Sequence, residues 1–305
     1  MKNGKKGTAL DSYRNSIRDK RVKLTNSTAR ELIRTLRVGF SHSTWEILVP
    51  LLLRVESTSL RLLLPRKVEY WNQIQLPIDV PKVNLIMELR LCLAFLRQSN
   101  EILISFRDFA TLYEEAYAIG NKDRCSEILA NIQNKTGHSL WLLRATIYHA
   151  ATFEGLEIQK EKAHSIIRMS PRSLVSFLSW QTSERNEEKV SIAGFSRRMR
   201  ETIEQDHIAK WTQAFLLREL INELPADADA LGGLLFSNFQ NSVVDYYECA
   251  VAILTKVANV PALQNELGND IADIASSFFN LAADRRLKKV AITINSTPGF
   301  DSSSP

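Results

Sequence analysis

Apolar residues recur at helical spacing along most of the chain. After Pro81, for example, Leu85, Leu89 and Leu93 follow one another every four residues. This spacing places apolar side chains on one face of an α-helix. It predicts helices over residues 26–39, 43–52, 60–64, 82–96, 105–119, 122–134, 139–153, 156–168, 172–182, 195–204, 206–223, 238–258 and 264–289. The sequence therefore predicts an all-α fold, either a helical-hairpin array (an α-solenoid) or an irregular helical bundle.

Breaks in this pattern predict the domain organisation. Pro65, Pro77 and Pro81 bound a stretch without helical period, and each proline favours extended backbone in the residue before it. Gly232-Gly233 is predicted to be a loop between helices. The predicted order is a basic flexible arm (1–25), an N-terminal helical unit (26–64), an extended connection (65–81), a helical-repeat array (82–289) and a disordered tail (290–305).

Two of the predicted helix pairs, within residues 105–171, share a period. Phe109 and Trp141 open the two pairs, 32 residues apart, and Gly120 and Gly155 mark the internal turns, 35 residues apart. The ends of the pairs, at Gly137 and Pro171, are 34 residues apart. A fixed period of this length is typical of stacked helix pairs.

This spacing resembles the tetratricopeptide-type repeat, over about 67 residues. Trp141, Ala145, Tyr148 and Pro171 match its pattern of a large aromatic, a small residue, a tyrosine and a closing proline. In the first pair Tyr113 stands where a small residue belongs. We interpret the matching aromatics as core residues. The resemblance implies a groove that holds a peptide or a partner helix.

Five side chains are predicted to contact an unidentified protein or peptide partner. Arg144, His149 and Lys160 lie between the core positions of the second pair. Tyr70 and Trp71 lie in the proline-bounded connection, and exposed aromatic residues are enriched in binding hot spots. The alternative for these two aromatics is that they attach the connection to the array.

Positive charge is concentrated near the N-terminus. Residues 1–37 contain 11 Lys and Arg against 3 Asp and Glu, whereas the remainder contains 28 against 31. This distribution excludes a uniformly basic nucleic-acid-binding domain. It leaves a basic arm that neutralises phosphates as an alternative function, next to a tail kept soluble by its charge. The candidate residues of the arm are Arg14, Arg18, Lys20, Arg21 and Lys23.

Two Glu-x-x-His pairs raise a catalytic alternative. Glu161 with His164, and Glu204 with His207, have the spacing found in carboxylate di-iron sites of helical bundles. Both pairs lie in polar runs, which favours solvated helix faces. The chain also contains no phosphate-binding glycine loop, no His-Glu-x-x-His and no Gly-x-Ser-x-Gly. We therefore predict a protein that is not an enzyme and holds no metal or cofactor.

The remaining features concern the compartment and self-association. The cysteines Cys92, Cys125 and Cys249 are odd in number and lie in apolar helical contexts, which predicts reduced thiols. No apolar stretch follows the N-terminal lysines, and charged residues interrupt Ile47–Leu64, so neither a signal peptide nor a membrane span is predicted. The expected protein is a cytoplasmic interaction scaffold. Its apolar Leu51–Leu64 region is a candidate surface for homo-oligomer formation.

Overall fold

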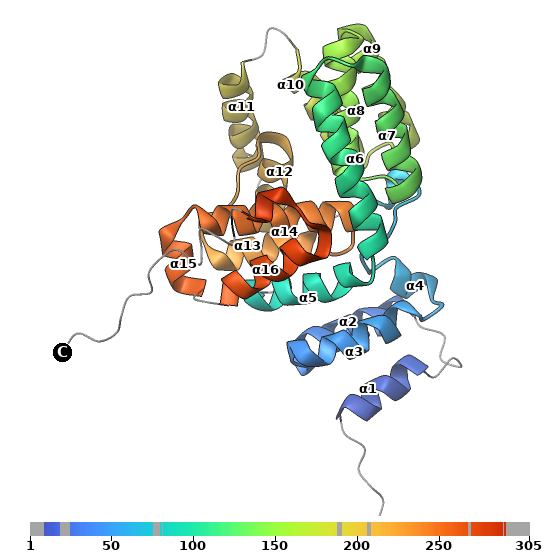
Figure 1. Ribbon diagram of the computed structural model, residues 1–305, viewed down its shortest axis with the longest axis vertical. Coiled ribbons are helices and arrows are strands. Elements are labelled where there is room, and N and C mark those ends of the chain that lie inside the picture. Colours follow the sequence, from blue (N-terminus) through green and yellow to red (C-terminus); the bar gives the residue numbers. More distant parts are fainter. Residues whose placement is uncertain are drawn as a thin grey trace, which may run out of the picture. The chain divides into compact units, whose positions relative to one another are not determined.

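The computed structural model describes residues 9–18, 25–75, 80, 82–187, 191–205, 209–267, 270–288 and 290. Among these residues helices are the regular elements, and the β-type pairing consists of two isolated bridges, which confirms the all-α fold class. The chain divides into two compact units, Met1–Pro65 and Arg66–Pro305 (Figure 1). No helix in the described ranges is both long and apolar enough to cross a membrane.

The first unit contains α1 (Ala9–Arg18), α2 (Asn26–Gly39), α3 (His42–Leu53) and α4 (Thr58–Arg61). Helix α2 has the predicted bounds, and Thr25 caps it by accepting the backbone N–H of Thr28. Trp45 on α3 is 1% exposed, and its indole N–H donates to the Leu36 carbonyl at 2.8 Å. The core of the unit therefore lies between α2 and α3.

Helix α1 occupies residues 9–18 of the segment that was predicted to be a flexible arm. The side chains of Tyr13 and Ile17 are buried, because they share one helix face at a spacing of four residues. The Tyr13 hydroxyl donates to the Leu32 carbonyl at 2.9 Å, and its ring lies edge-on to Phe40. One apolar turn in a polar segment was too short a pattern to predict this helix.

The region predicted to mediate self-association is largely interior. Leu52, Leu60 and Leu64 are at most 2% exposed, and Leu62 is the strongly exposed leucine there. Leu52, Leu60 and Leu64 therefore belong to the core, whereas Leu51, Leu53 and Leu63 are half-buried and keep part of the apolar run at the surface.

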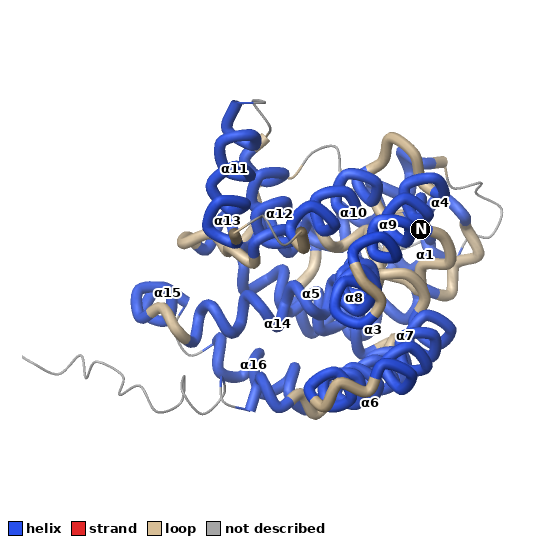
Figure 2. The backbone as a smooth tube through the Cα atoms, turned by 90° about the horizontal axis from the view of Figure 1, so that it is seen from above, coloured by secondary structure: helices blue, strands red, loops and turns tan. Residues whose placement is uncertain are grey.

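The second unit contains the predicted array and a second group of helices. Its elements are η1 (Trp71–Gln73), α5 (Leu85–Arg97), α6 (Asn100–Ala118), α7 (Lys122–Thr136), α8 (Leu140–Phe153), α9 (Leu156–Met169), α10 (Leu174–Arg185), α11 (Ile192–Gln205), α12 (Lys210–Ile221), α13 (Ala228–Ser237), α14 (Val243–Ala258), α15 (Pro261–Leu267) and α16 (Asp270–Ala282). Figure 2 shows these helices joined by mostly short loops. The single helix predicted over 264–289 is thus divided, with α16 ending where Ala283 has φ 49°.

Helices α6 to α10 pack pairwise in chain order, as the repeat pattern predicts. Gly120, Gly137 and Gly155 have positive φ at the turns, which confirms the predicted turn positions. Figure 1 shows α6 to α9 side by side, with α5, α13, α14 and α16 gathered at one end of them. An ion pair connects the two groups: Arg107 on α6 lies 3.3 Å from the buried Asp284, which follows α16.

The described part of the proline-bounded connection belongs, from Arg66 onward, to the second unit and contains η1. Arg66 forms a parallel bridge with Ser242, and Val68 forms one with Gly137. The ring of Trp71 packs edge-on against His138, with 4.4 Å between centroids. The segment therefore links the α7–α8 turn to the α13–α14 turn. Residues 76–79 and 81 of the predicted connection lie outside the described residues.

Gly232 and Gly233 correct another prediction, because they lie inside α13 rather than in a loop. A Cβ at Gly232 would lie 3.1 Å from the Val83 carbonyl oxygen. Residues 82–84 cross α13 so closely that a larger side chain would have to displace them. The two glycines thus reflect close packing between segments about 150 residues apart in the chain, which periodicity cannot show.

Gly137 provides a sharp test of the docked connection. Its φ is +81°, and an added Cβ would lie 2.3 Å from the Val68 carbonyl oxygen. Gly155 has φ +92° but no heavy atom within 4 Å of that position. We expect Gly155→Ala to lower the free energy of unfolding by about 1–2 kcal/mol from backbone strain alone. Gly137→Ala should lower the free energy of unfolding by on the order of 3 kcal/mol or more, since the added methyl group also pushes Val68 away from the α7–α8 turn. Urea denaturation of both variants measures the difference, and equal losses would contradict the docking.

Candidate functional site

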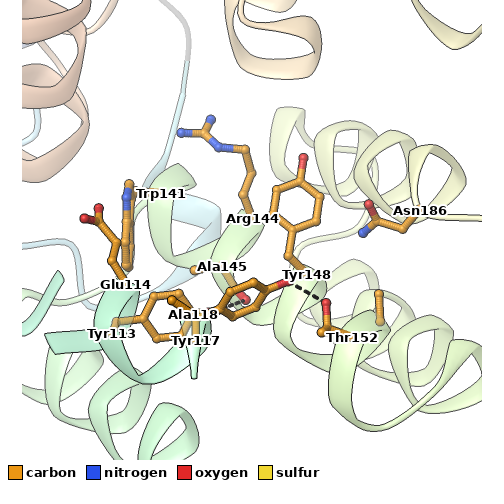
Figure 3. Close-up of a pocket in the computed structure, with 11 residues that line it drawn as sticks. Tyr113, Glu114, Tyr117, Ala118, Trp141, Arg144, Ala145, Tyr148, Thr152 and Asn186 are labelled. Carbon is orange, nitrogen blue, oxygen red and sulfur yellow. Dashed lines mark hydrogen bonds between the residues drawn. The ribbon is translucent and has the colours of Figure 1, made fainter. Parts of the chain in front are cut away.

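An open hollow lies over α6 and α8, with a volume of about 740 Å³. Figure 3 shows its aromatic side chains together with Arg144 and Glu114. The lining residues are Tyr113, Glu114, Tyr117 and Ala118 from α6, Trp141, Arg144, Ala145, Tyr148, Ala151 and Thr152 from α8, and Asn186 after α10. We call this hollow the α6–α8 groove. It lies on the opening helices of the two predicted pairs.

Contacts between α6 and α8 form the floor of the groove. The Tyr113 hydroxyl donates to the Ala145 carbonyl at 3.3 Å, and the ring of Tyr113 lies edge-on to Trp141. The hydroxyls of Tyr117 and Thr152 are 2.5 Å apart. Tyr113 thus fills the space beside the small Ala145, although the resemblance assigned a small residue to the position of Tyr113. Its neighbours Tyr117, Trp141 and Tyr148 are half-buried and keep part of their rings at the groove.

A buried charge cluster lies under one side of the groove. Arg144 on α8 and Arg218 on α12 both bind the carboxylate of Glu219, which is 4% exposed. Burial opposes the ionisation of Glu219, but Arg144 and Arg218 outweigh it and lower the pKa of this carboxyl. The ionised carboxylate of Glu219, on α12, therefore holds the guanidinium of Arg144, on α8, in place through a charge-assisted hydrogen bond.

Asp245 on α14 fixes the beginning of α8. Its two carboxylate oxygens accept the backbone N–H groups of Leu140, at 2.8 Å, and Trp141, at 3.1 Å. These N–H groups have no partner within the helix, so an acceptor from α14 positions the helix that carries most of the groove. Burial, followed by the nearby charge of Glu219, raises the pKa of Asp245 to about 7.

Charges of opposite sign lie near the two ends of the groove: Glu114 lines one end, and Arg185 does not line the hollow but adjoins it through Tyr148. Arg185 donates from Nη1 to the Leu220 carbonyl at 2.7 Å and to the Tyr148 hydroxyl at 3.2 Å. Glu114 lies beside Trp141, at the end away from Asn186 (Figure 3). Among the described residues, no carboxylate pairs with Arg185 and no cation pairs with Glu114.

The five predicted partner-binding residues are not brought together. Arg144 lines the groove, as predicted from its position on the second pair. Lys160 is accessible but lies on α9, 3.2 Å from Glu187. Tyr70 is 63% exposed and lies outside the groove. The other two side chains are buried, since His149 is 1% exposed and Trp71 is 7% exposed. Trp71 instead attaches the connection to the array, which was the alternative.

His149 belongs to a polar cluster that resembles a hydrolase site only in composition. Ser126 Oγ lies 2.9 Å from His149 Nε2, and Glu154 Oε1 lies 4.0 Å from the same nitrogen. In a nucleophilic triad the acid binds the other ring nitrogen, which here is buried without a hydrogen bond among the described residues. Burial lowers the pKa of His149, and Glu154 is paired with Lys162 at 2.6 Å. The geometry therefore does not match nucleophilic catalysis.

The other predicted sites receive little structural definition. Glu161 and His164 are exposed on α9, where His164 stacks on Trp180, and His207 lies outside the described residues. Within the described ranges, no three His, Cys, Asp or Glu side chains gather as a metal-binding group. In the basic arm, Arg14 lies 3.9 Å from Asp11. Lys20, Arg21, Lys23 and the side chain of Arg18 lie outside the described residues.

Comparison with known proteins adds no family to this geometry. No family model, no curated protein and no solved structure matches the chain. The similarity to the tetratricopeptide-type repeat therefore rests on the residue spacing and on the stacked helix pairs themselves.

Proposed function

We propose that this chain is a protein-interaction scaffold of the helical-repeat type, acting in the cytoplasm, and that the α6–α8 groove holds a peptide segment of its partner. The observation that carries the proposal is the hollow of about 740 Å³ lined by Tyr117, Trp141 and Tyr148. Partly exposed aromatic rings bury large areas at low entropic cost when a ligand covers them, so they are frequent anchors in binding sites.

The environment of the groove supports a pre-formed site. Asp245 fixes the first turn of α8, and Glu219 fixes the guanidinium of Arg144. A groove whose walls are already ordered loses less conformational entropy when a ligand binds. A volume of several hundred cubic ångströms is also in the range that accommodates a few side chains of a peptide.

The proposal is tested with the full chain and a phage-displayed library of random dodecapeptides. Peptides enriched on the wild-type protein are measured by fluorescence anisotropy against Ala118→Arg and Ala130→Arg. Ala118 is exposed and lines the groove, whereas Ala130 is exposed on α7 and does not line it. We expect Ala118→Arg to weaken binding at least about tenfold, because the new side chain occupies the hollow, and Ala130→Arg to leave it unchanged. Enriched peptides that bind both variants equally would place recognition elsewhere.

A further inference from the structure

We infer that the α6–α8 groove selects a peptide with separated charges: an aspartate or glutamate at the Arg185 end, a lysine or arginine at the Glu114 end, and aromatic or aliphatic side chains between them. This inference rests on the proposed function and adds the chemistry of the ligand and its direction in the groove. It is carried by the charges around the groove and by the contacts that each of them makes.

The Arg185 end has an excess of positive charge. Three guanidinium groups, those of Arg144, Arg185 and Arg218, lie around residues 218–220 near the end of α12, and that of Arg185 also contacts the Tyr148 hydroxyl. One carboxylate, that of Glu219, binds two of them, and Arg185 is held by a backbone carbonyl and a phenol hydroxyl rather than by an acid. The Arg185 guanidinium is therefore a cation that no described carboxylate pairs with.

The geometry of Arg185 leaves part of its guanidinium for a ligand. The hydrogen bonds to Leu220 and Tyr148 both use Nη1, so Nη2 and Nε make no hydrogen bond among the described residues. The guanidinium carbon lies 6.0 Å from the centroid of the Tyr148 ring, which lines the groove. Two N–H donors on a planar group match the two oxygens of a carboxylate. A ligand aspartate or glutamate beside Tyr148 would complete this site.

The Glu114 end has the opposite character. Glu114 is exposed on α6 and lies next to Trp141, whose ring also lines the groove (Figure 3). A carboxylate beside an indole face attracts a cationic side chain through charge and through the ring quadrupole. A ligand lysine or arginine at this end would pair with Glu114 and cover Trp141.

Between the two ends the groove is apolar and aromatic. Ala118, Ala145 and Ala151 keep the middle of the hollow open, while Tyr117 contributes an aromatic wall. Tyr117 is held there by its hydroxyl contact with Thr152. Because the two ends differ in charge, a peptide with both charges fits in one direction and meets like charges in the other. The groove therefore specifies the orientation of the ligand as well as its composition.

The test uses the peptides enriched from the random dodecapeptide library. We expect an acidic and a basic residue on opposite sides of an aromatic or aliphatic residue. Changing the peptide's acid to its amide should weaken binding to the wild-type protein about five- to tenfold, since a charge-assisted hydrogen bond is lost. The same change in the peptide should have little further effect on its affinity for the Arg185→Gln protein, which has already lost the guanidinium. Replacing the peptide's basic residue by glutamine should weaken its binding to the wild-type protein about threefold. The same replacement should leave its binding to the Glu114→Gln protein unchanged.

Arg168→Gln is the matched control for Arg185→Gln, since Arg168 is exposed on α9 and, unlike Arg185, makes no hydrogen bond to a groove residue among the described residues. The peptide substitutions keep the test decisive even if Arg185→Gln unfolds. Enriched peptides that are blocked by Ala118→Arg but bind equally well with both charges removed would overturn this inference and leave the peptide-binding function standing. If no enriched peptide responds to Ala118→Arg, both the inference and the proposed function are wrong.

Discussion

Replacing Glu219 by glutamine is expected to lower the free energy of unfolding by about 3–5 kcal/mol. The substitution keeps the shape of the side chain but removes the buried carboxylate that the guanidinium groups of Arg144 and Arg218 both bind. Arg218 is 8% exposed, so water cannot replace the missing carboxylate without opening the helix packing. Urea denaturation at neutral pH measures the loss.

Glu223→Gln is the matched control for this prediction. Glu223 lies 2.5 Å from Arg200, and both side chains are more than 40% exposed. An exposed pair of this kind contributes about 0–1 kcal/mol, because solvent screens it. If Glu219→Gln and Glu223→Gln lower the free energy of unfolding by the same amount, Glu219 does not fix the guanidinium of Arg144.

The second large effect is a loss of stability as the pH rises through about 7. Burial raises the pKa of Asp245 from 3.8 to about 7, so between these values the folded protein binds a proton that the unfolded chain has lost. The stabilisation from that proton is complete below pH 3.8 and disappears as the pH rises through the folded value. A shift of about three pKa units corresponds to at most about 4 kcal/mol.

The pH dependence is measured by urea denaturation from pH 5 to pH 8. Glu219, Arg144 and Arg218 are the charged groups that act on Asp245, and the pKa of Glu219 is lowered, so Glu219 stays ionised in this range. Asp245→Asn should flatten the profile, although it costs stability at every pH, because one amide oxygen replaces the two acceptors for the N–H groups of Leu140 and Trp141. A variant profile as steep as that of the wild type would contradict the assignment to Asp245.

Local patterns in the sequence predict most of the helical array. The period that links Phe109 to Trp141 matches the placement of α6 and α8, and the glycines at the predicted turns have the positive φ expected of them. Helix starts were less accurate at some positions: α5 was predicted to begin at residue 82 but begins at Leu85, after the cap Asn84. Such differences arise because a side chain that accepts a backbone N–H can cap the helix at any of several neighbouring residues, which shifts the observed start.

The site was predicted only in part, because its determinants are far apart in the chain. Arg144 was identified from its place in the repeat, but its partner Glu219 is 75 residues away and has no pattern that links the two. Asp245 looks like an ordinary first-turn acid of α14, and only the fold brings it to the start of α8. Trp141 and Tyr148 were interpreted as core residues, and no periodicity distinguishes a half-buried ring that lines a groove from a fully buried one.

The most direct test of the account is to map where a bound peptide lies. A peptide enriched from the library, with benzoylphenylalanine in place of its central aromatic or aliphatic residue, is cross-linked to the full chain, and the adducts are located by mass spectrometry. We expect adducts on Tyr117, Trp141 or Tyr148, and their loss in Ala118→Arg but not in Ala130→Arg. Adducts confined to the outer face of α7 or to residues 1–65 would show that the α6–α8 groove is not the binding site.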